Sequence, residues 1–426
     1  MQPALDRRRF LGSAATTGLA TLAARSKAAS PNATVSVAVI GVGSRGMDHA
    51  RGFAGMPGVE LAHVCDVDSR RAARAVEAVK GLSGGRATKA SGDLRRVLDD
   101  KAVDAVVIAT CNHWHAPAAI LACAAGKHVY VEKPCSHNPR EGELLVAAAR
   151  KHDRVVQMGN QRRSWPKIVE AIEQLRAGAI GRPYFAKCTY YNVRPSIGAG
   201  KQVATPAWLD YDIWQGPAPR RPYRDNILHY NWHWFWTWGN GELGNNGVHM
   251  IDLARWGLGV DYPTRVTSAG GRYRYRDDQE TPDTHVVSFE FEDRKAITWE
   301  GLSCDEFRPG GPGSDVVFYG ENGAMSITAG GYALHDVKGK TTKTVTGPGG
   351  DAVHQLNFLA AVRGDAKPNS EIAEGHKSTL PCHLGNIAHR TGRALRCDPR
   401  DGRILDDPAA MELWTREYAA GWAPSV

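Results

Sequence analysis

One segment near the start of the chain restricts its fold more than any other. Residues 35–40, Val-Ser-Val-Ala-Val-Ile, run directly into Gly-Val-Gly-Ser-Arg-Gly at residues 41–46. An apolar strand followed by a G-x-G-x-x-G turn is typical of dinucleotide-binding βαβ units. Gly41 permits the tight turn, Gly43 lets the backbone approach a pyrophosphate, and Gly46 allows a helix to pack closely on the strand. The N-terminus of that helix would present free N–H groups to the phosphates.

From residue 35 to about residue 158 the chain alternates apolar runs with Ala-rich segments of helical spacing. Unbroken apolar strands that alternate with helices indicate a parallel sheet covered on both faces. We therefore expect an α/β domain with a doubly wound parallel sheet, a Rossmann fold, over residues 33–159. The predicted strands are 35–40, 59–65, 103–109, 128–131 and 154–158, and the predicted helices are 69–80, 116–125 and 141–152.

The pattern changes after about residue 160. Gly- and Asp-rich turns now separate the apolar runs, which predicts an α+β domain over residues 160–426 with an open, mostly antiparallel sheet. A chain of 426 residues is long enough for two separate cores. The predicted elements are a helix at 166–177, an extended run at 184–193, strands at 265–275, 284–292, 296–302, 315–319 and 324–328, and helices at 354–363 and 376–396.

The charge and cysteine patterns exclude several classes of protein. Without residues 1–29 the chain has 48 basic and 44 acidic residues, a net charge of +4. Because this balance is mild and no basic run occurs, nucleic acid is not expected as a partner. The eight cysteines form no C-x-x-C pair and no His/Cys metal spacing, so we expect buried free thiols and no metal site.

Asp66 favours NAD as the bound dinucleotide. It follows the second predicted strand, 20 residues after Gly46, where a carboxylate accepts hydrogen bonds from the ribose hydroxyls of NAD. A carboxylate also repels the 2′-phosphate of NADP. Arg70 and Arg71 lie close enough in sequence to hold such a phosphate, so NADP stays an alternative to NAD.

The first 29 residues have the pattern of an export signal. The sequence Asp6-Arg-Arg-Arg-Phe-Leu-Gly precedes a weakly apolar run to Ala24 and small residues around Ala29. Arg25 and Lys27 place positive charge before the expected cleavage site, which favours the twin-arginine machinery over the general secretory route. Because that machinery exports folded proteins, we predict a periplasmic or secreted protein that carries its cofactor out with it. An ordinary secretory signal and an uncleaved tail are the alternatives.

Two polar segments lie where predicted strands finish, at the carboxyl edge of the parallel sheet. Ligands bind at this edge in doubly wound folds. The two segments are Thr-Cys-Asn-His-Trp-His at 110–115 and Ala-Gly-Lys-His-Val-Tyr-Val-Glu-Lys-Pro at 125–134. Together with the glycine turn and Gly-Asn-Gln-Arg-Arg at 159–163, they resemble the glucose-fructose oxidoreductase/inositol dehydrogenase/MocA family of nicotinamide-dependent oxidoreductases. The resemblance spans nearly the whole chain after the signal.

The resemblance implies a catalytic lysine, Lys133, beside the nicotinamide, where an ammonium stabilises a developing alkoxide. A cis peptide bond at Pro134 would aim that lysine. Relatives also carry Asp-x-x-x-His on a helix, and here Asn245 and His249 have this spacing, which places both on one helix face. His249 is the expected acid/base, whereas the amide of Asn245 orients a hydroxyl but accepts no proton. A helix N-cap role for Asn245 and a core role for His249 are the alternatives.

Aromatic residues are concentrated just before this predicted helix. Seven of the twelve tryptophans fall between residues 208 and 256. Flat aromatic rings stack on the C–H faces of sugars, and buried rings also contribute large apolar area to cores and interfaces. Core or interface packing is expected for most of them, while Trp232 and His233 are candidates to line a carbohydrate pocket.

These observations predict an exported NAD(P)-dependent oxidoreductase that transfers hydride between a tightly held cofactor and a sugar, cyclitol or related polyol. A glycoside hydrolase acting by transient oxidation and elimination, and a catalytically silent dinucleotide-binding scaffold, are alternatives. The resemblance also implies a homodimer or homotetramer. The predicted catalytic residues are Lys133, His249 and Asn245, and the predicted cofactor-binding residues are Gly41, Gly43, Ser44, Arg45, Gly46, Asp66, Thr110, Asn112, His115, Glu132, Lys133, Asn160 and Arg162. The predicted substrate-binding residues are Lys133, Arg163, Trp232, His233, Asn245 and His249.

Overall fold

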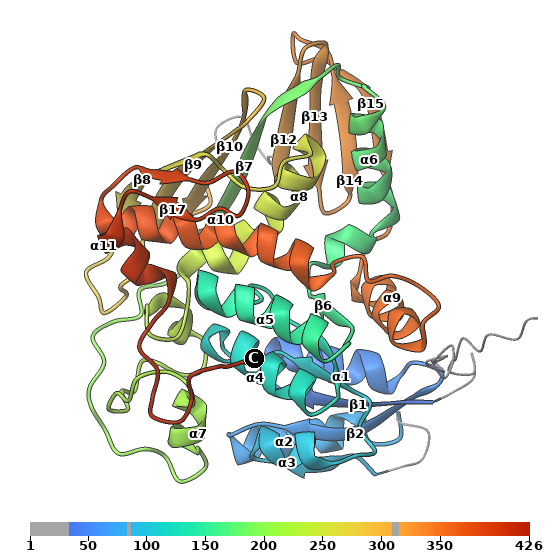
Figure 1. Cartoon of the computed structure of the whole chain (residues 1–426), viewed down its shortest axis with the longest axis vertical. Helices are drawn as coiled ribbons and strands as arrows, with labels where there is room; N and C mark the ends of the chain where they lie inside the picture. Colours follow the sequence, from blue (N-terminus) through green and yellow to red (C-terminus); the bar gives the residue numbers. More distant parts are fainter. Residues whose placement is uncertain (1–33, 83–86, 309–314) are drawn as a thin grey trace, which may run out of the picture.

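The computed structural model describes residues 34–82, 87–308 and 315–426, so the predicted signal at 1–29 lies outside the described residues. The first part of the chain forms a six-stranded sheet in the order β3-β2-β1-β4-β5-β6, with every neighbouring pair parallel (Figure 1). This order confirms the predicted doubly wound Rossmann fold. The strands are β1 (Val35–Ile40), β2 (Val59–Cys65), β3 (Lys89–Ser91), β4 (Ala105–Ile108), β5 (His128–Val131) and β6 (Val156–Met158).

Helices cover both faces of this sheet. Alternate residues of β1 explain why the strand is apolar throughout, since Val37 and Val39 enter one core while Ala38 and Ile40 enter the other. Helices α1 (Ser44–Ala54) and α2 (Ser69–Val79) contribute to the first core, and the second core contains side chains from α3 (Leu94–Asp99), α4 (Asn112–Ala124) and α5 (Pro139–Lys151).

The second sheet is mixed, with the order β15-β14-β13-β12-β7-β10-β9-β8-β16-β17, and β11 pairs with β7. Its pairs are antiparallel apart from β7 with β10, which confirms the predicted open, mostly antiparallel sheet. The strands are β7 (Pro183–Val193), β8 (Arg265–Gly271), β9 (Thr284–Phe291), β10 (Lys295–Leu302), β11 (Cys304–Asp305), β12 (Val316–Gly320), β13 (Gly323–Thr328), β14 (Gly331–His335), β15 (Thr341–Thr346), β16 (Leu395–Cys397) and β17 (Ile404–Leu405).

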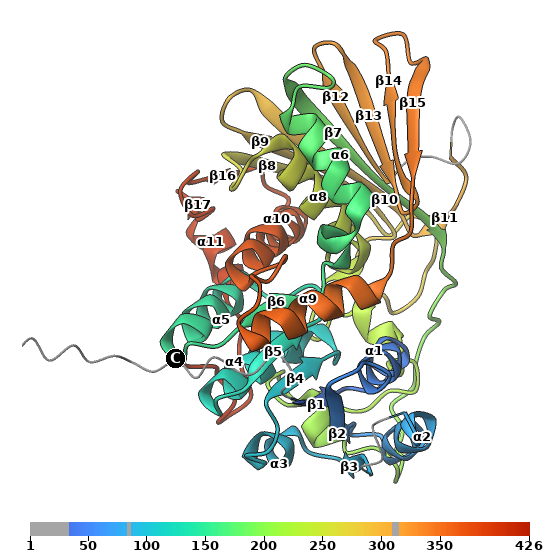
Figure 2. The same cartoon turned by 90° about the vertical axis from the view of Figure 1, so that its right-hand side faces the viewer.

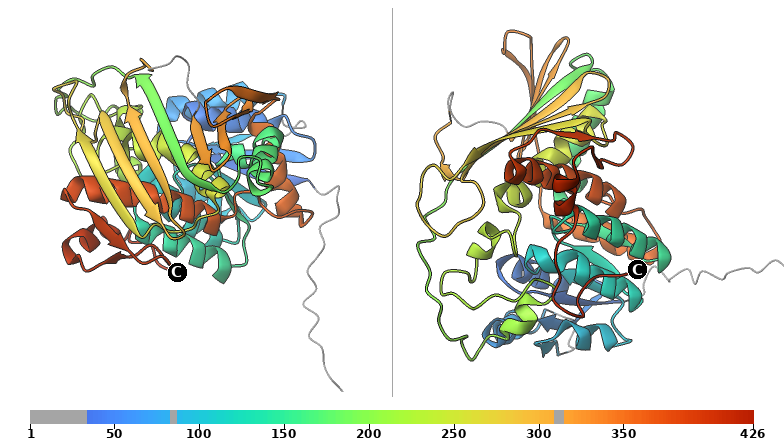
Figure 3. Two further views of the ribbon diagram at one scale, coloured as in Figure 1. Left: turned by 90° about the horizontal axis from the view of Figure 1, so that it is seen from above. Right: turned by 60° about the vertical axis from the view of Figure 1, so that its left-hand side comes forward.

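One face of the second sheet packs on three helices, α6 (Pro166–Arg176), α8 (Val248–Leu258) and α10 (Ile372–Thr391) (Figure 3). Leu253 and Leu384 on two of these helices share a core with Phe289 and Trp299 of the sheet. Within the described residues, no helix is both long and apolar enough to cross a bilayer. All eight cysteines are free; six of them are buried as expected, whereas Cys111 and Cys304 are partly exposed.

The last part of the chain returns to the first sheet. Phe358 and Leu359 of α9 (Asp351–Arg363) belong to the same core as β1, and Figure 2 shows α9 beside that sheet. Trp422 packs against the opposite core. The predicted boundary at residue 160 therefore separates the two sheets, but residues after it complete the core of the first domain.

A long connection between β7 and α8 crosses from the second sheet to the end of β2 (Figure 1). It contains the short helices α7 (Tyr211–Gln215) and η2 (Asn231–Trp234). The backbone N–H of Ser69 donates to the Trp208 carbonyl at 3.0 Å, and the N–H of Asp210 donates to the Val67 carbonyl at 3.0 Å. The connection therefore covers the carboxyl edge of the parallel sheet.

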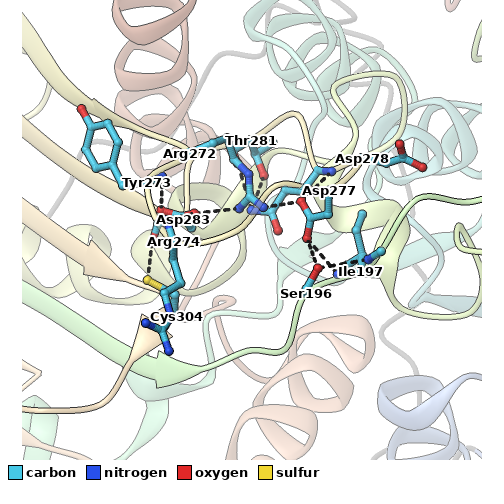
Figure 4. A network of polar contacts seen from close by, with 12 residues as sticks. Ser196, Ile197, Arg272, Tyr273, Arg274, Asp277, Asp278, Thr281, Asp283 and Cys304 are labelled. Carbon is cyan, nitrogen blue, oxygen red and sulfur yellow. Dashed lines mark hydrogen bonds and ion pairs between the residues drawn. The ribbon is translucent and has the colours of Figure 1, made fainter.

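Acidic residues between β8 and β9 fix the other part of this connection (Figure 4). The Asp277 carboxylate accepts hydrogen bonds from the Ser196 hydroxyl at 2.7 Å and from the Ile197 N–H at 2.9 Å. Asp278 accepts from the Gly200 N–H at 2.7 Å and from the Asn226 amide at 2.8 Å. These contacts attach the connection to the second sheet.

Candidate active site

A cavity of about 440 Å³ lies between the carboxyl edge of the parallel sheet and the long connection. Most of the predicted site residues meet here, although they come from distant parts of the sequence. The predicted residues that line it are Gly41, Gly43, Ser44, Arg45, Asp66, Thr110, Asn112, His115, Glu132, Lys133, Trp232, His233 and Asn245.

The glycine turn leaves the space that a pyrophosphate needs. A Cβ added to Gly43 would meet only the Arg71 guanidinium, at 3.0 Å, whereas one added to Gly46 would lie 1.7 Å from the Gly41 carbonyl oxygen. Asn112, at the start of α4, keeps a buried side-chain oxygen without a hydrogen-bond partner. The open cradle at Gly43 and this orphaned acceptor fit a bound dinucleotide.

Two backbone hydrogen bonds hold the Asp66 carboxylate in place and leave it able to bind a ribose. Its two carboxylate oxygens accept single hydrogen bonds, from the N–H groups of Val42 and Asp68, each at 2.9 Å. A carboxylate oxygen can accept a further bond, so both are available to hydroxyl groups. Burial raises the pKa of Asp66, and the two backbone N–H groups oppose that rise.

The two arginines after Asp66 are not equivalent. The Arg70 guanidinium lies 3.5 Å from the ring centroid of Trp208 and pairs with Asp68 at 2.9 Å, so it is already used. Arg71 lines the cavity. We expect Asp66→Ser to weaken NAD binding by about tenfold or more, because one or two charge-assisted hydrogen bonds are lost. NADP binding should strengthen relative to NAD, since Arg71 then faces the 2′-phosphate without the Asp66 carboxylate, while Asp68 stays 4.0 Å from Nε of Arg71.

Fluorescence titration with both dinucleotides measures this change in preference. Asp66→Ser combined with Arg71→Ala is the matched control, and it should lose the gain in NADP affinity. An unchanged ratio of the two dissociation constants in Asp66→Ser would contradict the role of Asp66.

Glu132 and Arg45 line the cavity but neutralise each other. One Glu132 oxygen lies 2.7 Å from Nε of Arg45 and 2.8 Å from Nε2 of His49. Burial alone would raise the pKa of Glu132, but these neighbours, Arg45 first, hold it well below its usual range. Arg45 also pairs with Asp351 of α9. The ion pairs fix the cavity wall and join α9 to it.

The side-chain ammonium of Lys133 contacts Asn245, another of the predicted catalytic residues. Its Nζ donates to the backbone carbonyl of Asn245 at 2.8 Å and to the side-chain oxygen at 3.0 Å. Burial lowers the pKa of Lys133. The Lys133–Pro134 peptide bond is cis, as the sequence indicated.

The helix around Asn245 differs from the prediction. Residues Leu243–Gly247 form a π-helical turn, and the regular helix α8 starts only at Val248. Asn245 is therefore not a helix N-cap, which corrects that alternative. Its amide nitrogen lies 3.3 Å from Oε1 of Glu242. Single π-helical turns occur frequently at functional sites.

Tyr230, which lines the cavity, and two residues in contact with the site, Arg194 and Glu242, were not predicted from the sequence. The amide of Asn245 also lies 3.4 Å from the Tyr230 hydroxyl, and Glu242 pairs with Arg194 at 2.6 Å. Tyr230 belongs to the aromatic run before the catalytic segment, which was the available signal for it. Arg194 and Glu242 carry no local sequence signal, because only the fold brings them together.

Five predicted residues do not line the cavity: Gly46, Asn160, Arg162, Arg163 and His249. Arg163 pairs with Asp252 of α8 at 2.8 Å in the core, which corrects its assignment to the substrate. Arg162 pairs with Asp315 at 2.9 Å. Asn160 is 1% exposed, and its amide oxygen and nitrogen have no partner within the described chain.

His249 does not line the cavity. It is half-buried on α8, and its Nδ1 is buried without a hydrogen-bond partner among the described residues. Burial lowers the pKa of His249 well below its ordinary value, and the positive charges of Lys133 and Arg162 lower it further. Its predicted acid/base role stays a prediction.

The aromatic run divides between packing and the cavity, as expected. Trp238 is fully buried in the core of the long connection. Trp214 and Trp232 contribute to that core and also line the cavity. His233 stacks on Trp232, with ring centroids 3.5 Å apart and planes 21° apart.

Two family models match the chain in succession. Residues 35–160 match the oxidoreductase family with the NAD-binding Rossmann fold, and residues 197–424 match the C-terminal alpha/beta domain of the same family. The chain belongs to the Gfo/Idh/MocA oxidoreductase family. Its first domain is therefore an NAD-binding Rossmann domain, in agreement with the cradle at Gly43 and the position of Asp66.

The individual proteins that the chain resembles are only moderately similar to it in sequence. Inositol 2-dehydrogenase 4 of Saccharopolyspora erythraea is 34% identical over 177 residues, which cover 40% of this chain and 50% of that enzyme. The chain thus spans about half the length of the curated relatives it matches. The WlbA dehydrogenase of Bordetella pertussis, solved with NADH and UDP-GlcNAcA, aligns with a TM-score of 0.65 at 19% identity, covering 86% of this chain and 99% of that one. Aldose-aldose oxidoreductase of Caulobacter crescentus aligns with a TM-score of 0.65 at 20% identity, covering 85% and 99%.

Proposed function

We propose that this protein is an NAD-dependent oxidoreductase that converts a CH–OH group of a cyclitol, sugar or related polyol into a carbonyl, and the reverse. The observation that carries the proposal is the position of Lys133, which lines the cavity at the carboxyl edge of the sheet and donates from Nζ to Asn245. NAD, held by the glycine turn and Asp66, supplies the acceptor for the hydride.

The residues of the chain bind and polarise the substrate. The Lys133 ammonium donates to the reacting oxygen and stabilises negative charge that develops on it. The Asn245 amide orients a hydroxyl, and the rings of Trp214 and Trp232 offer flat surfaces to the C–H face of a sugar or cyclitol. The long connection forms one wall of this part of the cavity.

The likeness to inositol 2-dehydrogenase 4 supports a polyol substrate. The test is to release small molecules from the purified, undialysed protein and to record absorbance of the reduced nicotinamide before and after exposure to myo-inositol and a panel of sugars. Bound NAD whose redox state changes with one of these compounds is the expected result. A protein that binds NAD but reduces it with none of them would contradict the proposed activity.

We also propose that the protein is exported by the twin-arginine machinery with its nucleotide held tightly. The argument rests on residues 1–29 and on the long connection, which covers the cleft at Trp208 and Asp210. N-terminal sequencing of protein from the periplasm tests export, and the nucleotide content of that fraction tests retention. A homodimer or homotetramer is the proposed assembly, and light scattering tests it.

A further inference from the structure

A second cavity, of about 560 Å³, lies apart from the reaction cavity. Among the described residues, none lines both cavities. Four parts of the chain form its walls: the residues before α5, the long connection, α10 and the last residues of the chain. They contribute His137, Asn240, Asn386 and Arg416, respectively. Its volume is within the range of about 300–1,000 Å³ that small-molecule sites occupy.

Three of the lining residues have buried polar atoms without a hydrogen-bond partner in the part of the chain that the structure describes. These atoms are both ring nitrogens of His137, Oδ1 of Asn240, and Nε and Nη1 of Arg416. His137 is only 9% exposed. Because buried polar groups in native proteins are nearly always paired, these atoms need a partner from outside the chain, either water or a ligand.

A buried carboxylate holds these groups in place. Oε1 of Glu141 accepts from Nη2 of Arg416 at 2.9 Å and from the Tyr418 hydroxyl at 3.0 Å. Oε2 of Glu141 accepts from the backbone N–H of His137 at 3.0 Å, and the Asn240 amide donates to the His137 carbonyl at 2.9 Å. The unpaired groups are therefore positioned by the fold, and the charge of Arg416 is already balanced by Glu141.

The unpaired atoms include both donors and acceptors. Burial, followed by the charge of Arg416, holds the pKa of His137 well below its ordinary value, so its ring is neutral. A neutral imidazole has one N–H and one lone pair, the Asn240 oxygen only accepts, and the Arg416 guanidinium only donates. A hydroxyl group both donates and accepts, so a ligand with several hydroxyl groups can pair with all three residues. A carboxylate or a fully ionised phosphate has no donor for Asn240.

The charges at the mouth of the cavity favour a neutral ligand. The charged lining residues other than Arg416 are all exposed, and they are Glu280, Glu412, Glu417, Arg221 and Arg390. Three carboxylates and two guanidinium groups leave no excess of positive charge to attract an anion.

An aromatic ring adds an apolar surface to this wall. Trp236 lines the cavity and is half-buried, and the Arg390 guanidinium carbon lies 5.2 Å from its ring centroid. An indole ring packs on the C–H face of a sugar, whose hydroxyl groups then point to polar neighbours.

We propose that this second cavity binds a neutral carbohydrate or polyol, at a site distinct from the one where a substrate reacts. The hydroxyl groups of the ligand pair with His137, Asn240 and Arg416, and its C–H face lies against Trp236. The proposal goes beyond the proposed oxidation and does not depend on it.

Fluorine NMR of the full-length protein containing 5-fluorotryptophan tests the proposal at the site itself. The Trp236 signal is assigned by its absence in Trp236→Phe. The protein is saturated with NADH, so that no polyol is oxidised, and is titrated with glucose, galactose, myo-inositol and sucrose. Gluconate and inorganic phosphate are the anionic probes. We expect at least one neutral compound to shift the Trp236 signal saturably, and to bind more tightly than either anion.

His137→Phe removes both unpaired nitrogens and breaks no side-chain hydrogen bond within the described chain, so it should fold normally. The dissociation constant of the best compound should rise by about tenfold or more, because hydrogen bonds to buried groups are lost. Thr415→Tyr, at an exposed position that lines the mouth, should cause a similar loss by blocking entry. His376→Phe is the matched control, since His376 is buried on α10 at 7% exposure but does not line this cavity.

Three results would overturn the inference. If no neutral compound shifts the Trp236 signal up to about 100 mM, beyond the millimolar range of weak specific binding, the cavity holds water alone. Tighter binding of gluconate or phosphate than of any neutral compound would assign the cavity to an anion. An unchanged dissociation constant in both His137→Phe and Thr415→Tyr, or an equal loss in His376→Phe, would place the sugar elsewhere. Activity is not part of this readout, so a protein that oxidises no polyol still gives a result here.

Discussion

Lys133→Met should reduce kcat for polyol oxidation by about 10² to 10³, because it removes the ammonium that the proposed function places at the reacting oxygen. Methionine keeps much of the length and apolar volume of the lysine stem, so the cavity wall should remain packed. NAD affinity should change little, because the dinucleotide cradle at Gly43 and Asp66 is separate from Nζ. Single-turnover reduction of bound NAD measures the step directly.

Lys127→Met is the matched control. Lys127 is also buried, and its Nζ donates to the carbonyl oxygens of Asp100 and Val103 at 2.7 and 2.8 Å, but it does not line the cavity. Its loss should lower stability by about 1–3 kcal/mol without a matching loss in kcat. Equal losses of turnover in the two variants would mean that Lys133 acts through the fold.

The pH dependence of oxidation gives a second check on Lys133. Because burial lowers the pKa of this ammonium, it loses its proton at a lower pH than an exposed lysine. If the ammonium form is needed, kcat should fall on the alkaline side, with its midpoint below the ordinary lysine value. Lys133→Arg should move that fall to higher pH, because a guanidinium stays protonated.

The parts of the site that the sequence predicted depend on short motifs. A glycine turn after a strand, a carboxylate at the end of β2, and a lysine after β5 are all local patterns, and parallel strands bring their carboxyl ends to one edge. For this reason Gly43, Asp66 and Lys133 reach the same cavity.

The predictions that proved wrong concern residues whose contacts depend on the tertiary fold. Arg163 follows a family motif, but α8 places Asp252 against it, and a buried arginine must be paired. The π-helical turn at Leu243–Gly247 interrupts a pattern that reads as regular helix. The return of α9 to the first core depends on packing between residues hundreds of positions apart, which no local period reveals.

The contacts that the long connection makes with the site also have no signal in the sequence. Arg194 and Glu242 are 48 positions apart, yet their ion pair stands beside Tyr230 and Asn245. The aromatic run predicted a crowded region here, but not which ring would face the cavity. Hydrogen bonds between side chains and backbone carbonyls, such as that between Nδ1 of His233 and the Tyr230 carbonyl, have no sequence pattern that would predict them.

Alanine substitutions at Gly43 and Gly46 should affect stability and NAD binding differently, and this contrast tests the dinucleotide cradle. Gly46→Ala places a Cβ 1.7 Å from the Gly41 carbonyl oxygen, which is backbone and cannot move aside. Helix α1 must shift from β1, so we expect about 1–3 kcal/mol or more of lost stability and a lower Tm together with the loss of NAD binding. Gly43→Ala meets only the Arg71 guanidinium, at 3.0 Å, and this side chain can move.

Gly43→Ala should therefore fold with a Tm close to wild type and still lose about tenfold to a hundredfold in NAD affinity, because the methyl group occupies the place of the pyrophosphate. Gly55→Ala, at the other end of α1, is the control, since its Cβ would meet the Arg51 carbonyl at an ordinary 3.4 Å. Thermal unfolding without nucleotide and titration with NAD separate the two effects. Normal NAD affinity in a folded Gly43→Ala protein would place the pyrophosphate away from this turn, and the assignments of Asp66 and Lys133 would then lose their common reference point.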